Sequence, residues 1–307
     1  MSQRLRTALA GISGILVTPM DAADQVQPAL LAPIIARCAE AGVDALTVNG
    51  NTGEFFSLTC AEAERMQAEV PALVAGRAAV VAGVGRSVQE AVALARRARA
   101  DGVDAVMVHQ PPDPFVAPRG VVAYVNRVAD AAGLPLVLYL RQDGIGLPAL
   151  EALTRIEAVV AVKWATPNLM LLAEAMRRAG PAVTFICGLA EPWAPPMAAL
   201  GTQGFTSGLA NLAPGRSVAI RDALRRGDMA AARAGIAAIA GFEALRAEEQ
   251  NGANVAVVKA ALGMVGHAVG AARPPAAWPL PPGSLARLRS LLAGWGMIRQ
   301  PEEGPTR

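Results

Sequence analysis

Two stretches of the chain, Ala39-Glu-Ala-Gly-Val-Asp-Ala-Leu-Thr-Val48 and Arg99-Ala-Asp-Gly-Val-Asp-Ala-Val-Met-Val108, are near copies of each other. In each copy a helical pattern ends at a glycine, and a run of apolar and β-branched residues begins within three residues. Gly42 and Gly102 are two units of about thirty residues apart, and Gly133, before another apolar run, continues the spacing. The spacing predicts helices and parallel strands that alternate along the chain.

Eight apolar runs of strand length follow this spacing, and their composition is typical of parallel strands that are buried on both faces. They are residues 12–19, 45–49, 78–84, 104–109, 135–140, 158–164, 183–188 and 203–209. Thr59-Cys-Ala-Glu62 and Ser87-Val-Gln-Glu90 are capping boxes, which predict the starts of two of the helices.

Eight such units predict an α/β fold, a closed (β/α)8 TIM barrel over residues 1–227, with reactive groups at the carboxyl ends of the strands. The pattern of residues 228–298 predicts additional helices that pack on the barrel. The proline-rich stretch 273–282 interrupts this helical pattern. We expect residues 299–307 to form a flexible tail.

The composition bears on the oligomeric state of the protein and on whether it binds nucleic acid or a membrane. Charged residues make up 17% of the chain, below the usual share of about 25%, so we expect burial between subunits in a homo-oligomer, a dimer or tetramer. The 28 basic and 25 acidic residues are interspersed, which argues against a nucleic-acid partner. No apolar run reaches the roughly 20 residues that span a bilayer and no leader opens the chain, so we expect a cytoplasmic protein without a membrane partner.

The cysteines and histidines of the chain indicate neither disulfide bonds nor a metal site. Three cysteines, Cys38, Cys60 and Cys187, form neither a disulfide framework nor a metal spacing, which favours a reducing compartment. The two histidines, His109 and His267, lie far apart in the sequence, so we expect neither a bound metal nor a cofactor.

The chain contains only two lysines, Lys163 and Lys259, and arginine supplies nearly all of its positive charge. Lys163 lies in Val159-Val-Ala-Val-Lys-Trp-Ala165, near the carboxyl end of the sixth predicted strand. Burial there lowers the pKa of an amine and makes the neutral, nucleophilic form accessible, so Lys163 is a candidate for imine formation with a keto group. The alternative is an ammonium that reaches the barrel rim or pairs with a carboxylate. Lys259, on a helical pattern outside the barrel, is interpreted as structural.

Three other positions follow predicted strands. Tyr139 ends the fifth strand next to Lys163 and is a candidate proton relay, or alternatively an aromatic side chain filling the barrel mouth. Gly50-Asn-Thr-Gly-Glu54 follows the second strand, and its exposed N–H groups, with the Thr52 hydroxyl, are suited to hold a carboxylate. We interpret Glu54 as an anchor rather than a base. His109, at the end of the fourth strand, is either a substrate ligand or a hydrogen-bonded rim histidine.

In this order, these motifs resemble the dihydrodipicolinate synthase and N-acetylneuraminate lyase superfamily of class I aldolases. The resemblance extends over nearly the whole chain, through Gly11-Ile-Ser-Gly-Ile-Leu-Val-Thr-Pro19, Gly50-Asn-Thr-Gly-Glu54, Tyr139, Lys163, Gly204-Phe-Thr-Ser-Gly208 and Val258-Lys259-Ala260. It implies that Lys163 forms a Schiff base with a 2-oxo acid and that Tyr139 shuttles protons. It also implies that Asn51 and Thr52 grip the substrate carboxylate, and that Gly188 and Ser207 line the pocket.

Departures from the pattern bear on the substrate. Asn51 stands where dihydrodipicolinate synthases have threonine, Gly144 stands where they have an arginine, and the loop 109–115 lacks their tyrosine. The run 53–59 and Arg141, two places after the tyrosine, are instead similar to 5-dehydro-4-deoxyglucarate dehydratase, although Leu140 replaces that group's asparagine. In this interpretation Arg141 binds the distal carboxylate of a sugar diacid.

The sequence therefore predicts a Schiff-base-forming lyase that acts on a small-molecule 2-oxo acid, either an aldolase or a dehydratase. The local similarity favours a sugar-acid enzyme like 5-dehydro-4-deoxyglucarate dehydratase. One alternative is a pyruvate-dependent aldolase of the dihydrodipicolinate synthase type. Another is a non-catalytic protein that binds 2-oxo acids.

Overall fold

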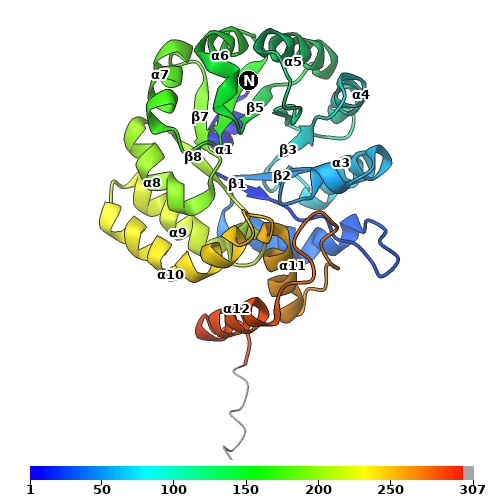
Figure 1. The fold of residues 1–307 in the computed structure, drawn as a ribbon, viewed down its shortest axis with the longest axis vertical. Helices are drawn as coiled ribbons and strands as arrows, with labels where there is room; N and C mark the ends of the chain where they lie inside the picture. The colour runs from blue at the N-terminus through cyan, green and yellow to red at the C-terminus, as the bar shows by residue number, and fades with distance from the viewer. Residues whose placement is uncertain (300–307) are drawn as a thin grey trace, which may run out of the picture.

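The computed structural model describes residues 1–299 and contains eight parallel strands, paired in chain order around a closed barrel (Figure 1). The strands are β1 Ile12–Ile15, β2 Ala45–Val48, β3 Ala79–Val84, β4 Ala105–His109, β5 Leu136–Leu140, β6 Val159–Trp164, β7 Thr184–Cys187 and β8 Gly204–Ser207. Each strand lies within the apolar run that predicts it. The predicted (β/α)8 barrel is confirmed.

One helix, α1, precedes β1, and the helices from α2 to α9 follow the strands and cover the outside of the barrel (Figure 1). They are α1 Gln3–Leu9, α2 Ala32–Ala41, α3 Cys60–Val74, α4 Val88–Ala98, α5 Pro118–Ala132, α6 Gly146–Thr154, α7 Leu169–Ala179, α8 Ala190–Leu200 and α9 Pro214–Arg225. Both predicted capping boxes are present: Thr59 caps α3 and Ser87 caps α4, each in reciprocal contact with the glutamate three residues later.

The near-repeats share an aspartate with the same structural task. Asp44 accepts a hydrogen bond from the backbone N–H of Ile12 at 2.8 Å, and Asp104 accepts one from Val80 at 2.8 Å. Each aspartate thus satisfies a buried donor at the start of a neighbouring strand. The repeated sequence therefore serves the contact between neighbouring strands as well as the turn itself.

The barrel interior is a packed core, with α1 closing its amino-terminal end through Leu5 and Leu9. At the carboxyl end, strand register places His109, Tyr139 and Lys163 in one row across β4, β5 and β6. Residues paired across parallel strands share a face of the sheet, so this row faces the barrel axis.

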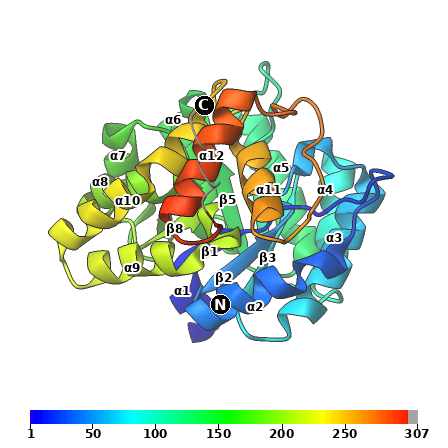
Figure 2. The same ribbon diagram turned by 90° about the horizontal axis from the view of Figure 1, so that it is seen from below.

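Three further helices, α10 Met229–Ala247, α11 Asn254–Met264 and α12 Pro282–Gly294, lie together on one side of the barrel, next to α8 and α9 (Figures 1 and 2). The predicted C-terminal helices are therefore present. The predicted tail, residues 299–307, falls outside the described residues except for its first residue. Within residues 1–299, no helix combines the length and apolar character needed to cross a bilayer.

Candidate active site

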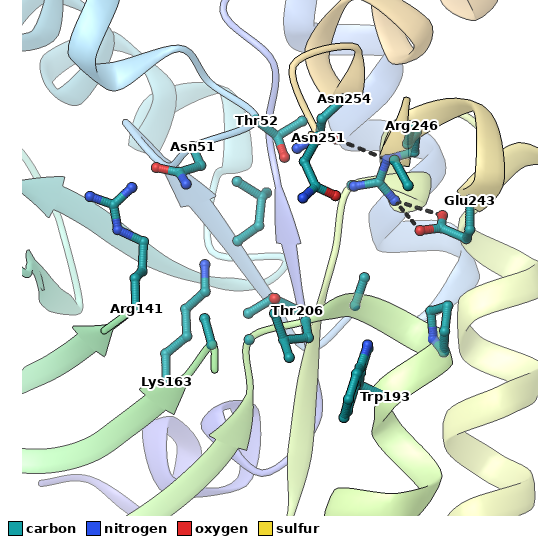
Figure 3. A pocket seen from close by; sticks show the side chains of 18 of the residues that line it. Asn51, Thr52, Arg141, Lys163, Trp193, Thr206, Glu243, Arg246, Asn251 and Asn254 are labelled. Carbon is teal, nitrogen blue, oxygen red and sulfur yellow. Dashed lines mark hydrogen bonds and ion pairs between the residues drawn. The ribbon is translucent and has the colours of Figure 1, made fainter. Parts of the chain in front are cut away.

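A cavity of about 530 Å³ opens at the carboxyl end of the barrel (Figure 3). Six of the residues singled out from the sequence line it: Asn51, Thr52, Tyr139, Arg141, Lys163 and Gly188. They come from the segments that follow β2, β5 and β7 and from the ends of β5 and β6. The carboxyl end of the barrel is where the fold positions side chains for chemistry.

Lys163 is buried, with 3% of its surface exposed, and its side chain points into the cavity (Figure 3). Its Nζ lies 3.7 Å from the centroid of the Tyr139 ring, and no carboxylate of the described residues pairs with it. Burial lowers the pKa of Lys163 to about 7, and the positive charge of Arg141 acts in the same direction. A large fraction of this amine is therefore neutral, and nucleophilic, near neutral pH.

Tyr139 is held by Asn51, whose Nδ2 donates a hydrogen bond to the phenol oxygen at 3.1 Å. Because the phenol accepts this bond, its own proton remains free to be donated. Burial raises the pKa of Tyr139 to about 12, so the hydroxyl keeps its proton near neutral pH. Asn51 thus positions the tyrosine, a contact that the sequence does not predict.

The turn after β2 leaves two donors free. The N–H groups of Gly53 and Glu54 donate to carbonyls within the turn at 3.1 and 3.0 Å. Those of Asn51 and Thr52 have no hydrogen-bond partner among residues 1–299. Two adjacent free N–H groups beside a hydroxyl form a concave donor site that suits a carboxylate.

Glu54 anchors this turn to the C-terminal helices. It is buried in a left-handed conformation at φ 58°, and its carboxylate pairs with the buried amine of Lys259 on α11. The same carboxylate accepts a bond from the Arg273 N–H at 2.7 Å, and Lys259 donates to the Ala271 carbonyl at 2.9 Å. These contacts support the interpretations of Glu54 as an anchor and of Lys259 as structural.

Replacing Lys259 by methionine is expected to lower the free energy of unfolding by about 3 kcal/mol, because it leaves the Glu54 carboxylate buried without a counter-charge. Urea unfolding followed by circular dichroism measures this loss. The double variant Glu54→Gln/Lys259→Met is expected to recover part of it, since it removes both charges. A single variant as stable as the wild type would show that the pair does not hold the turn.

Arg141 brings an uncompensated positive charge to the cavity. Its guanidinium carbon lies 5.2 Å from the centroid of the Phe56 ring and 5.5 Å from that of Tyr139, and no carboxylate of the described chain pairs with it. Two aromatic faces fix its position without neutralising its charge. An arginine in this state is suited to bind an anionic group of a ligand.

The structure does not bring His109 and Ser207 to the cavity. His109 is fully buried, stacks on Phe55 at 4.5 Å and donates from Nε2 to the Asn49 carbonyl at 2.9 Å. Burial lowers its pKa to about 3, so the ring is neutral. Ser207 points away from the barrel axis, where its hydroxyl bonds that of Ser217 at 3.0 Å.

Six polar or aromatic residues that line the cavity were not singled out from the sequence: Trp193, Thr206, Glu243, Arg246, Asn251 and Asn254. For Thr206 a signal exists, because side chains alternate along a strand and the inward position on β8 is one residue before Ser207. The others lie on α8, α10 and α11 and on the loop 248–253. Among residues 1–299, no group of three histidine, cysteine or acidic side chains is arranged to hold a metal ion.

Comparison with known proteins places the chain in a family. The model of the dihydrodipicolinate synthetase family matches residues 8–282. The chain is 31% identical over 297 residues to a 4-hydroxy-tetrahydrodipicolinate synthase of Exiguobacterium, covering 94% of this chain and 99% of the relative. It is 30% identical over 246 residues to a probable 5-dehydro-4-deoxyglucarate dehydratase of Methylobacterium radiotolerans, covering 78% of this chain and 81% of the relative.

A solved structure is similar over the whole barrel. Dihydrodipicolinate synthase from Bacillus clausii superposes with a TM-score of 0.90 at 35% sequence identity, covering 95% of this chain and 99% of that one. Sequence and structure thus match the same family from the first strand to the C-terminal helices. The chain belongs to the dihydrodipicolinate synthetase family and is a lyase of that family.

Proposed function

We propose that the protein cleaves a 2-oxo acid through a Schiff base on Lys163. The observation that carries this proposal is a buried amine, free of any carboxylate partner in the described chain, that faces a cavity beside a phenol and a turn with free donors. The turn at Asn51 and Thr52 binds the substrate carboxylate, which places the C2 carbonyl at the amine.

Catalysis begins when neutral Lys163 attacks C2, and the carbonyl oxygen leaves as water after accepting protons. The resulting iminium withdraws electrons, so C3 loses either a proton or a carbon substituent to give an enamine. In the dehydratase case C3 loses a proton, and the enamine then expels the hydroxyl group of C4, which takes up a proton and leaves as water. In the aldolase case the bond from C3 to its carbon substituent breaks, and C3 then takes up a proton. Both routes restore an iminium. Tyr139 donates the proton that the departing oxygen requires and accepts it back when the iminium is hydrolysed. Water finally releases the product and restores the free amine.

The substrate class that the site favours is a sugar diacid, in a reaction like that of 5-dehydro-4-deoxyglucarate dehydratase. Arg141, with its uncompensated charge, binds the distal carboxylate in this proposal. The similarity to the Methylobacterium relative supports it. The second candidate is pyruvate-dependent aldolase chemistry of the dihydrodipicolinate synthase type, which the Exiguobacterium relative supports.

A panel of 2-oxo acids separates the candidates by their products. Release of carbon dioxide and loss of water from 5-dehydro-4-deoxyglucarate supports the dehydratase, whereas release of pyruvate from a hydroxylated 2-oxo acid supports the aldolase. Binding of panel members without turnover of any of them would contradict the enzymatic proposal and indicate a 2-oxo acid binding protein.

The pH dependence of kcat/KM is expected to follow the Lys163 amine. Only the neutral amine attacks the carbonyl, so kcat/KM rises about tenfold per pH unit below the pKa and levels off above about 7. Initial rates between pH 5.5 and 9 at low substrate concentration measure this profile. A profile that is flat across that range would show that Lys163 does not titrate in the free enzyme.

Replacing Arg141 by glutamine is expected to raise KM for a diacid substrate about 10- to 100-fold, because a charge-assisted contact to the distal carboxylate is lost. The midpoint of the pH profile is expected to move upward as well, since the arginine lowers the pKa of Lys163. Steady-state kinetics at several pH values measures both effects. An unchanged KM for the diacid would remove Arg141 from substrate recognition.

A further inference from the structure

The side chain of Gln110 takes the place of backbone at the point where β4 ends and β5 continues. The last residue pair of the two strands is His109 with Tyr139, and the Gln110 N–H donates to the Tyr139 carbonyl at 3.0 Å. In a regular parallel ladder the backbone carbonyl of Gln110 would then accept from the Arg141 N–H. Here the side-chain Oε1 of Gln110 accepts that bond instead, at 2.6 Å.

The sequence after Gln110 explains this arrangement. Alternate residues of a parallel strand donate to the same neighbour, so the next donor of β4 would be Pro112, which has no N–H group. The chain after β5 still presents the N–H groups of Arg141 and Gln142, which need acceptors. Gln110 Oε1 accepts from both, at 2.6 and 3.0 Å. Only 4% of Gln110 is exposed, so water has little access to these bonds.

The segment that Gln110 holds has little stiffness of its own. Two glycines follow closely, Gly144 and Gly146, and the second has a φ angle of 72°. Within residues 1–299, no hydrogen bond other than that from Gln110 reaches the backbone of Arg141. The position of the Arg141 backbone at the cavity therefore depends on one side-chain amide.

Arg141 needs this support because it lies next to a second cation, Lys163 (Figure 3). The Arg141 guanidinium carbon lies 5.5 Å from the centroid of the Tyr139 ring, and Lys163 Nζ lies 3.7 Å from the same centroid. Like charges repel whenever the amine is protonated, and a long arginine side chain can turn toward water. Phe56, the other ring that contacts the guanidinium, is 40% exposed. A fixed backbone limits how far the guanidinium can move away.

We propose that Gln110 is a positioning residue of the active site, which holds the Arg141 backbone so that the guanidinium stays beside Lys163 and free for an anionic group. Gln110 does not line the cavity, so it acts only through Arg141. The inference rests on the proposed function, because imine formation at Lys163 is its readout. It does not require a sugar diacid as the substrate, since pyruvate also reports on the amine.

The test compares the wild type with Gln110→Met, which keeps the side-chain length but removes the acceptor. The ligands are pyruvate and 2-oxoadipate, which carries a second carboxylate at the far end of its chain. Arg141→Gln and the double variant Gln110→Met/Arg141→Gln complete a double-mutant cycle. The matched control is Gln67→Met on α3. Gln67 is also buried and donates to the Leu94 carbonyl at 3.0 Å and to Asp101 at 2.8 Å, but it does not line the cavity.

Borohydride trapping at pH 9, where the Lys163 amine is mostly neutral, measures affinity. Gln110→Met is expected to raise the half-saturating concentration of 2-oxoadipate about tenfold, because two N–H groups lose their acceptor and the Arg141 segment shifts. The concentration for pyruvate is expected to stay within about twofold of the wild type. In the Arg141→Gln background, Gln110→Met is expected to have no further effect on 2-oxoadipate.

The pH dependence of pyruvate trapping supplies a second readout. Its midpoint is expected to move upward by about half a pH unit in Gln110→Met, because the guanidinium that lowers the pKa of Lys163 is no longer held beside the amine. Arg141→Gln is expected to move the midpoint in the same direction. In the Arg141→Gln background, Gln110→Met is expected to leave the midpoint where it is.

The controls separate positioning from stability. Gln67→Met also removes buried hydrogen bonds, yet it is expected to behave as the wild type toward both acids and in the pH profile. Gln110→Asn carries the test if Gln110→Met fails to fold. Its amide is one methylene shorter, so it is expected to lose one of the two bonds and to weaken 2-oxoadipate alone, about threefold.

Equal weakening of pyruvate and 2-oxoadipate with an unchanged midpoint would assign Gln110 a structural role and overturn the inference. An effect of Gln110→Met that is as large in the Arg141→Gln background would also overturn it, because Gln110 would then not act through Arg141. If the wild type forms an adduct with neither acid, the proposed function fails and the inference fails with it. Adducts in the wild type that do not respond to Gln110→Met refute the inference alone.

Discussion

Replacing Lys163 by methionine is expected to abolish turnover, with kcat lower by at least about 10⁴-fold. Methionine fills a similar volume in the buried position but has no amine, so no imine can form and no electron-withdrawing group adjoins C3. Product formation from the best substrate of the panel measures the loss. Residual activity within tenfold of the wild type would remove Lys163 from the mechanism.

The same variant is expected to be more stable than the wild type, by roughly 2–4 kcal/mol at neutral pH. The folded pKa of Lys163, about 7, lies below the ordinary value of 10.5, so the native state binds fewer protons than the unfolded chain. Stability is therefore lost as pH falls from about 10.5 to about 7, and methionine does not incur this cost. An inactive but stabilised variant separates lost chemistry from misfolding, whereas a destabilised variant would contradict the uncompensated burial of the amine.

Replacing Tyr139 by phenylalanine is expected to lower kcat about 10³-fold, because imine formation and imine hydrolysis both become slower. The ring that packs against Lys163 remains, but the hydroxyl that Asn51 positions is lost, so protons reach the departing oxygen only through water. Borohydride trapping measures the rate of imine formation, and single-turnover kinetics measures the rate of product formation.

Tyr124, the other tyrosine of the chain, provides a matched control. It is partly buried on α5, and its hydroxyl donates to the Arg86 carbonyl at 3.3 Å, away from the cavity. Tyr124→Phe is expected to keep kcat within about twofold, since it removes one neutral hydrogen bond outside the site. A Tyr139→Phe variant that is as active as Tyr124→Phe would show that the phenol at position 139 does not relay protons.

The fold could be read from the sequence because its periodicity is strong. Glycines that end helices recur at a regular spacing, and strands buried on both faces appear as apolar runs with clear boundaries. The strand assignment also placed the main site residues, because the carboxyl ends of all the parallel strands lie at one end of the barrel. These residues are Lys163, Tyr139 and the turn at residues 50–54.

The rest of the site depends on information that a linear pattern does not contain. Ser207 was expected to line the pocket, but a shift of one residue along β8 exchanges the inward and outward faces, and Thr206 takes the inward position. His109 does face the barrel axis, yet its ring packs against Phe55 and Tyr139 and does not line the cavity. Glu243 and Arg246 reach the site only because α10 packs beside α8, and no local motif encodes that contact.

The most direct test of the account is reduction with borohydride in the presence of pyruvate, followed by peptide mass mapping of the protein. The account predicts a single adduct on the peptide that contains Lys163, formed more slowly below pH 7 and absent from the Lys163→Met variant. Labelling of Lys259 or of the amino terminus instead, or no labelling with any 2-oxo acid of the panel, would contradict it.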